Sequence, residues 1–209
     1  SYFLFATTRE QLAYLRFPLG DMPKSRVREL ANELGVRVAE KPDSQDICFV
    51  PQGKYVDVVK KLRPGAVEPG EIVDTQGRVL GKHEGVINYT VGQRRRLGVA
   101  TGQPLFVVKL DAGKRRVIVG PRESLGVTRI ALKDVNWIGD DDASLSGRDL
   151  LVRVRSTRPP VDARIVLGAA GISVVLDAPE EGVAPGQAAV FYDKDSTRVL
   201  GGGWIAATE

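Results

Sequence analysis

Cysteine and histidine are almost missing from this chain, whose 209 residues include one of each, Cys48 and His83. One cysteine cannot form an internal disulfide, so the fold does not depend on one, and this suits a reducing cytoplasm. A lone cysteine and a lone histidine also cannot supply a zinc site by themselves. A catalytic pair of the two has no support in their spacing, and a surface position is the favoured interpretation of His83.

Long apolar runs and phosphate-binding glycine loops are missing as well. No apolar stretch reaches the length that spans a bilayer, and we expect a cytoplasmic protein with no membrane partner. The stretch GVATGQ, at residues 98–103, lacks the Lys-Ser/Thr ending of a Walker motif. The sequence therefore gives no support to a membrane protein or to a P-loop nucleotidase.

Positive charge is concentrated in the middle of the chain. The whole chain has a formal net charge of +4, but residues 63–124 hold eleven basic and six acidic side chains, a net charge of +5. Residues 1–62 carry +2 and residues 125–209 carry −3. A basic segment is the usual electrostatic signature of nucleic-acid binding, and a solvated surface with additional arginines is the alternative interpretation.

The first sixty residues predict short helices. Thr8 and Gln11 form a Thr-x-x-Gln capping box, which opens a helix. A second helix is expected after Pro23, because apolar residues recur there at helical spacing, and Gly35 is placed to end it. The opening stretch, SYFLFATT, reads as part of a buried strand, and with no initiator methionine it indicates a piece of a longer protein that begins inside a domain.

The rest of the chain reads as short strands separated by turns. Proline and glycine crowd residues 64–70, and a second break lies near Leu125. Many short strands at this spacing are typical of small barrels or sandwiches. We therefore divide the chain into residues 1–62, a central β domain at 63–124, and a C-terminal domain at 125–209.

Cys48 has two interpretations. Free cysteines are most often buried structural thiols. Here, however, the residue follows the polar, turn-prone stretch KPDSQD, where Lys41 and Lys54 would favour the thiolate while Asp43 and Asp46 would oppose it. The residues alone leave both interpretations open.

Two arginine groups are candidates for contacts with phosphate. Arg94, Arg95 and Arg96 are consecutive and lie between glycines, which indicates an exposed turn. Arg153 and Arg155 are two residues apart, so a strand directs both to one face, with valines on the opposite face. The solvent face of a half-buried strand is the simpler interpretation of this second pair.

Several stretches together resemble one family of enzymes. The chain is similar over essentially its whole length to the tRNA-specific 2-thiouridylase family (MnmA/TrmU). The stretches that carry the resemblance occur in the family's order: SYFLF, FPLGDMPKSRVRELA, KPDSQDICFV, NYTVGQRRRLG, PLFVVKLD and APGQAAVFYD. The DSxxICF and GQRxxLG blocks are the most specific of them.

The resemblance implies a fold and an activity. The implied fold is α+β and multidomain: the helical and loop tail of an α/β ATP-pyrophosphatase domain, a small central β domain and a C-terminal β-barrel. The implied activity is 2-thiolation of the wobble uridine of tRNA, in which ATP with magnesium activates the base and a cysteine persulfide supplies the sulfur. Cys48 matches the persulfide-bearing cysteine, and a cysteine desulfurase or sulfur carrier is the implied donor protein.

The resemblance also implies contacts with tRNA and points to missing parts. Arg155 and Ser156 match a family Arg-Tyr pair, with serine in place of the tyrosine that would stack on a base, and Gln187 matches a further contact. The family's Ser-Gly-Gly-x-Asp-Ser loop is not in this chain, and neither is the partner cysteine. We therefore expect no ATP site here and no activity from the chain alone.

Three hypotheses follow. The first is a thiouridylase fragment with Cys48 as sulfur carrier, and the second is an RNA-binding β-barrel module with a purely structural cysteine. The third, an unrelated cysteine enzyme such as a hydrolase, lacks a base and an oxyanion site and ranks last.

Overall fold

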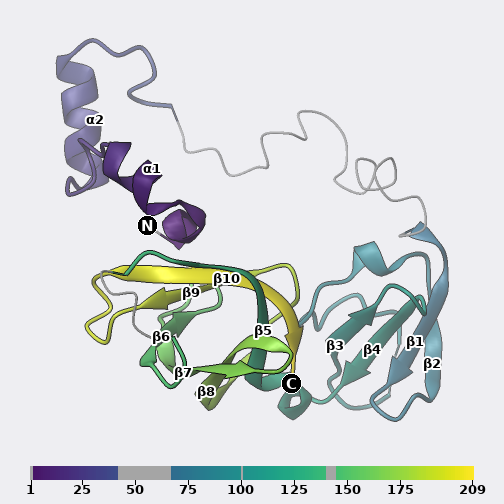
Figure 1. Cartoon of the computed structure of the whole chain (residues 1–209). Coiled ribbons are helices and arrows are strands. Elements are labelled where there is room, and N and C mark those ends of the chain that lie inside the picture. The colour runs from purple at the N-terminus through teal and green to yellow at the C-terminus, as the bar shows by residue number, and fades with distance from the viewer. Residues whose placement is uncertain (1, 42–66, 100, 140–144) are drawn as a thin grey trace.

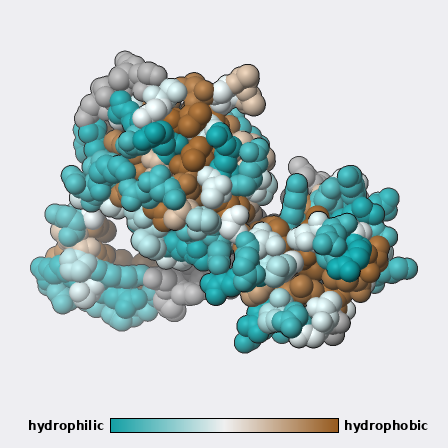
Figure 2. All heavy atoms as spheres, turned by 90° about the horizontal axis from the view of Figure 1, so that it is seen from below, coloured by the Kyte–Doolittle hydropathy of each residue, from teal (hydrophilic) through white to brown (hydrophobic). Residues whose placement is uncertain are grey.

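The described residues form two β units and a helical N-terminal segment. The computed structural model describes residues 2–41, 67–99, 101–139 and 145–209. Figure 1 shows the helical segment above a barrel, with a separate sheet beside the barrel. In Figure 2 the two β units form two lobes, and hydrophilic residues cover much of the visible face of both. The predicted combination of few helices with a C-terminal barrel is confirmed.

The N-terminal segment contains a 3-10 helix, η1 (Tyr2–Ala6), and two α-helices, α1 (Arg9–Tyr14) and α2 (Lys24–Glu33). The predicted capping box opens α1, and α2 starts directly after Pro23. The buried strand expected at the start of the chain is wrong. The segment forms a 3-10 helix in which Phe5 alone is buried and Tyr2 is partly buried against the same cluster. It therefore lacks the alternate buried residues of a strand. No helix of the described residues combines the length and apolar character of a membrane span.

The central unit is a four-stranded sheet in the order β2-β1-β4-β3. Its strands are β1 (Gly70–Asp74), β2 (Val79–His83), β3 (Phe106–Asp111) and β4 (Arg116–Gly120). β1 runs parallel to β4, and the other pairs are antiparallel. β3 and β4 form a hairpin, and its turn is closed by Lys114 N–H, which donates to the Asp111 carboxylate at 2.9 Å. Buried residues hold this unit together: Ile72, Val86, Leu97, Val107, Val117 and Val119.

The C-terminal unit is a closed barrel in the order β10-β5-β8-β7-β6-β9. A 3-10 turn, η4 (Arg122–Leu125), leads into it from the sheet. Its strands are β5 (Gly126–Trp137), β6 (Asp149–Arg153), β7 (Val161–Gly168), β8 (Gly171–Glu181), β9 (Ala188–Tyr192) and β10 (Val199–Thr208). Every second residue of a strand points inward, so the barrel is filled by apolar side chains. The largest of these are Phe191, Ile130, Leu150, Ile165 and Ile205.

The N-terminal segment is anchored to the outside of the barrel through Phe5. The Phe5 ring is 2% exposed and packs edge-on against Trp204, with 5.3 Å between ring centroids. Gly202 makes this approach possible, because a Cβ there would lie 2.8 Å from the Phe5 ring. Asn136 Nδ2 donates to the Phe5 carbonyl at 2.7 Å and to the Thr7 carbonyl at 2.9 Å. These contacts place η1 beside the start of β9.

We predict that Phe5→Ala lowers the free energy of unfolding of the barrel by about 3 kcal/mol, because it removes a buried ring and leaves a cavity. Phe3→Ala is the matched control, since Phe3 is 81% exposed and its loss should cost less than about 0.5 kcal/mol. Urea denaturation followed by tryptophan fluorescence measures both, because both tryptophans belong to the barrel unit. Equal losses for the two variants would contradict the anchoring role of Phe5.

Candidate nucleic-acid interface

Cys48 lies outside the described residues, within the range 42–66. The structure therefore assigns it no neighbours, and its proposed role as sulfur carrier stays a prediction from the sequence. The other predicted site residues, Arg94–Arg96, Arg155, Ser156 and Gln187, are all described.

Arg155, Ser156 and Gln187 line one cavity of about 480 Å³ on the side of the barrel, which we call the barrel pocket. Arg155 and Ser156 follow the end of β6, and Gln187 directly precedes β9. β6 and β9 are paired neighbours in the barrel, which explains how residues about thirty positions apart in sequence converge. The other lining residues are Tyr2, Phe3, Phe5, Thr90, Val154, Thr157, Ala188 and Trp204.

Gln187 offers a hydrogen-bond acceptor without a partner. Its backbone carbonyl accepts from Ile205 N–H at 2.8 Å, which fixes the residue against β10. Its side-chain Oε1 is buried and accepts no hydrogen bond from the described residues. A buried polar atom left unpaired costs free energy, so a ligand that donates to this oxygen would recover it.

The Arg155 guanidinium is held at the edge of the barrel pocket by the residue that follows β8. Its Nη2 donates to the Gly182 carbonyl at 2.5 Å, while its Nε is buried without a partner among the described residues. Gly182 has φ of +74°, and a Cβ there would lie 2.6 Å from Nη2. Two features favour glycine at this position, the backbone conformation and the close approach of Arg155.

The side-chain alternation predicted around Arg155 is observed. Val152 and Val154 are buried in the barrel core, while Arg153 and Arg155 face outward. Arg153 does not simply face solvent, because its guanidinium lies 5.0 Å from the centroid of the Tyr192 ring. Arg153 thus makes a cation–π contact, whereas Arg155 lines the barrel pocket.

Aromatic rings that sequence reasoning missed border the barrel pocket. Tyr2 and Phe3 pack edge-on with 5.4 Å between ring centroids, and Tyr2 OH donates to the Ala188 carbonyl at 2.9 Å. Trp204 contributes a third ring that is 38% exposed. The pocket thus has stacking surfaces although Ser156 replaces the family's tyrosine. The signal was the stretch SYFLF, whose rings were interpreted as strand core.

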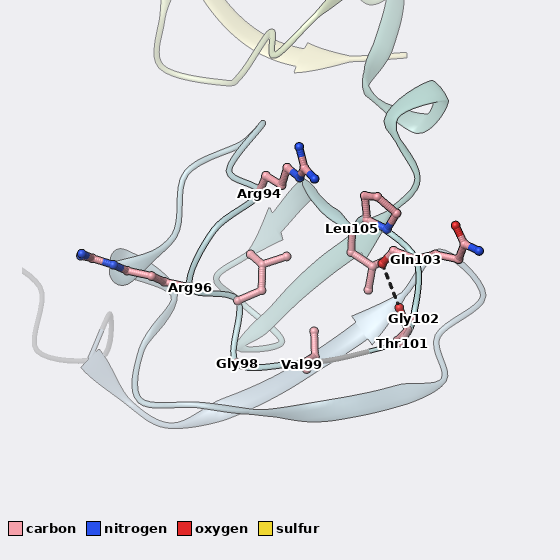
Figure 3. A pocket seen from close by; sticks show the side chains of 10 residues that line it. Arg94, Arg96, Gly98, Val99, Thr101, Gly102, Gln103 and Leu105 are labelled. Carbon is pink, nitrogen blue, oxygen red and sulfur yellow. Dashed lines mark hydrogen bonds between the residues drawn. The ribbon is translucent and has the colours of Figure 1, made fainter.

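Arg94, Arg95 and Arg96 are exposed and lie in an irregular segment of the central unit. They diverge. Arg94 and Arg96 line a cavity of about 450 Å³ formed with the following loop, and Figure 3 shows their side chains pointing in different directions, Arg94 toward the barrel. Arg95 lines neither this cavity nor the barrel pocket. Buried Leu97 anchors the segment in the sheet core.

His83 is buried, so the surface position expected for it is wrong. It ends β2 and is 3% exposed. Its Nδ1 accepts from Gly85 N–H at 3.0 Å, so Nε2 carries the proton that faces the Arg115 carbonyl at 3.1 Å. Both ring nitrogens are engaged with the backbone, and His83 is a structural residue that ties the edge of β2 to the turn before β4.

Further charged residues lie where the sheet unit meets the barrel. Arg122 donates to both oxygens of Glu181, with its Nε 2.9 Å from Oε1, and Arg158 pairs with Glu180. The hydrogen bonds from Arg122 hold the pKa of Glu181 below its ordinary value. Sequence reasoning missed these residues, because the pairs join positions 22 and 59 residues apart.

The helix starts of the N-terminal segment bear on binding of a nucleotide triphosphate. In residues 2–41 the two α-helices begin at Arg9 and Lys24, and neither follows a glycine-rich loop that could cradle a triphosphate. The chemistry that the described surface supports is binding of a polyanion with unstacked bases, through guanidinium groups, aromatic rings and an unpaired amide oxygen.

Three family models match successive parts of the chain. A tRNA methyl transferase HUP domain matches residues 1–52, a tRNA methyl transferase PRC-barrel domain matches residues 57–121, and an aminomethyltransferase beta-barrel domain matches residues 127–205. The third match coincides with the closed barrel described above.

Curated relatives are similar over the whole chain. The chain is 64% identical over 209 residues to the tRNA-specific 2-thiouridylase MnmA of Maricaulis maris, a match that covers 100% of this chain and 51% of the relative. It is 64% identical over 210 residues to the protein of the same name from Hyphomonas neptunium, covering 99% of this chain and 53% of the relative. The chain thus spans about half the length of the curated relatives it matches.

We predict that Gly182→Ala releases the Arg155 guanidinium from the Gly182 carbonyl, because the added methyl group occupies its place. Gly147→Ala is the matched control: Gly147 has φ of +77°, but a Cβ added there would meet nothing within 4 Å. Both variants should lose about 1 kcal/mol of unfolding free energy from backbone strain, and Gly182→Ala about 1 kcal/mol more from the lost hydrogen bond. Thermal unfolding and the NMR signal of Arg155 Nε–H measure this. An unchanged Arg155 signal in Gly182→Ala would contradict it.

Proposed function

The chain belongs to the tRNA-specific 2-thiouridylase (MnmA/TrmU) family, and from this premise we propose that it serves 2-thiolation of the wobble uridine of tRNA. In this proposal the barrel pocket binds the tRNA, and Cys48 carries the sulfur as a persulfide. The observation that carries the proposal is the convergence of Arg155, Ser156 and Gln187, from two separate stretches, in one cavity bordered by aromatic rings.

The proposed division of labour assigns binding to this chain and activation of the base to another part of the enzyme. ATP with magnesium is the proposed cofactor, held outside the described residues, and a sulfur-donor protein such as a cysteine desulfurase or sulfur carrier is the proposed source of the persulfide. The cytoplasm is the proposed location. A persulfide suits the task because its terminal sulfur is a strong nucleophile, whereas a hydroxyl cannot carry a sulfur atom.

The barrel pocket suits a nucleotide whose base has left its stack. Tyr2, Phe3 and Trp204 offer ring surfaces, and base–aromatic stacking contributes about 1–3 kcal/mol per base. Gln187 Oε1 can accept from an amino or imino group of the base, and Arg155 can bind a phosphate oxygen. Stacking tolerates any base, so the amide oxygen is the proposed source of discrimination.

We predict that the chain binds tRNA with an affinity that falls as salt rises, and that Gln187→Ala weakens this binding about fivefold. The stability of Gln187→Ala should not fall, because its Oε1 has no partner to lose among the described residues. Gln76→Ala, at an exposed turn that does not line the barrel pocket, is the matched control and should bind as the unaltered chain does. Fluorescence anisotropy with labelled tRNA measures all three. Equal affinities of the two variants would remove Gln187 from the proposed site.

Replacing the cysteine separates this proposal from an RNA-binding module with a structural thiol. In a family member of full length, serine at the position of Cys48 should abolish 2-thiouridine formation and leave tRNA affinity unchanged, because the hydroxyl cannot form a persulfide. Mass spectrometry of digested tRNA measures the product, and filter binding measures the affinity. Thiolation at an undiminished rate would leave the RNA-binding module as the function of this chain.

A further inference from the structure

A second cavity, which we call the arginine cleft, lies where the sheet unit meets the barrel. It encloses about 290 Å³, and both units contribute to its wall. Four of its residues are arginines, two from each side of the junction: Arg94, Arg122, Arg155 and Arg158. Glu181 is the one carboxylate among the described residues that line it, so positive charge dominates.

The four guanidinium groups are not equally neutralised. Arg122 is paired with Glu181 and Arg158 with Glu180, so these two carry local counter-charges. Arg155 donates to a carbonyl oxygen and has no carboxylate partner among the described residues. Arg94 makes no hydrogen bond or ion pair within that same part of the chain. Two uncompensated guanidinium groups therefore border one small cavity.

We propose that the arginine cleft binds one phosphate group of the RNA backbone, held between Arg94 of the sheet unit and Arg155 of the barrel. This inference rests on the proposed function, in which RNA occupies the barrel pocket. The two cavities share Arg155, so an RNA strand bound in the barrel pocket brings a backbone phosphate within reach of the cleft. Planar guanidinium groups match phosphate oxygens with paired hydrogen bonds, which makes arginine the suitable side chain here.

A bound phosphate would also relieve the charge repulsion between the arginines of the free protein. Like charges held near one another repel, and the repulsion grows where the walls of a cleft exclude water. An anion between Arg94 and Arg155 turns this repulsion into attraction. Glu181 supplies part of that negative charge from within the chain, and its carboxylate opposes an incoming phosphate. The cleft is therefore built to prefer an anion but to bind it with limited strength.

The position of the cleft gives the phosphate a second role. Gly92 of the sheet unit and Gly182 of the barrel approach closely, because a Cβ on Gly92 would lie 4.0 Å from the Gly182 Cα. A Cβ at this point would be in ordinary van der Waals contact, so the two units lie side by side here. A phosphate bound by arginines of both units would fix their relative orientation when RNA is bound.

Arg94 provides the direct test, because Arg95 beside it is a control of equal charge. Arg94→Gln should lower the slope of log affinity against log salt by about 1 and weaken tRNA binding about eightfold at 0.1 M salt, the effect of one lost phosphate contact. Arg95, also exposed, does not line the cleft, and Arg95→Gln should change the slope by much less. Both variants should unfold as the unaltered chain does. Equal slopes for the two variants would overturn the inference.

A second variant, which should strengthen tRNA binding, tests the same cleft. Glu181→Gln removes the carboxylate that opposes phosphate, so tRNA should bind several-fold more tightly. Asp195→Asn removes the same charge at an exposed turn outside the cleft and is the control. No gain with Glu181→Gln beyond that with Asp195→Asn would count against a phosphate in the cleft.

The same measurements separate this inference from the proposed function. If the unaltered chain binds no tRNA at low salt, the proposed function fails and the inference fails with it. If it binds tRNA but Arg94→Gln and Arg95→Gln behave alike, only the inference is overturned. Inorganic phosphate is the second probe, expected to compete with tRNA only at millimolar concentration. If inorganic phosphate binds at micromolar concentration without displacing tRNA, the cleft is a site for a free anion. That result would overturn the inference that the cleft binds a phosphate of the RNA backbone.

Discussion

The hydrogen bond from Arg155 to the Gly182 carbonyl is the contact on which both cavities depend. It holds one guanidinium in the wall between the barrel pocket and the arginine cleft, so the two cavities share a charged group. The bond exists because β8 is followed by a residue with φ of +74° and no side chain. A local backbone requirement at the end of one strand thus determines the electrostatics of a surface that joins two units.

Charge counted along the chain and charge arranged in space lead to different views of this surface. The count predicted nucleic-acid binding by residues 63–124, which have a net charge of +5. It did not predict such binding by residues 125–209, which have a net charge of −3. Yet two arginines of the cleft, Arg155 and Arg158, come from the net acidic part. Among the described acidic residues of that part, Glu181 lines the cleft and pairs with Arg122, and Glu180 pairs with Arg158. A polyanion responds to the local arrangement, since exposed charges beyond about 10 Å are screened.

Local signals in the sequence predicted local structure well. The capping box at Thr8 and the valine alternation around Arg155 each depend on residues within a few positions of one another. The incorrect interpretations, the strand in SYFLF and the surface position of His83, concern side chains whose partners are distant in sequence. The division at 62 and 124 and the role of Cys48 stay predictions. The resemblance to a family suggested Arg155 and Gln187 as site residues, whereas the rings of SYFLF beside them were interpreted as strand core.

Those rings connect the barrel with the segment that leads to Cys48. Tyr2 and Phe3 reach the barrel pocket only because Phe5 is buried against Gly202 and Trp204. In the proposed function, an RNA base stacked on these rings contacts the barrel and the N-terminal segment at once. The serine at position 156 is then no loss, because stacking is supplied by Tyr2 and Phe3 of the segment that precedes the cysteine in sequence and by Trp204 of the barrel. RNA held there is positioned relative to the N-terminal segment as well as to the barrel, which is what an enzyme needs when one part binds the substrate and another part carries the sulfur.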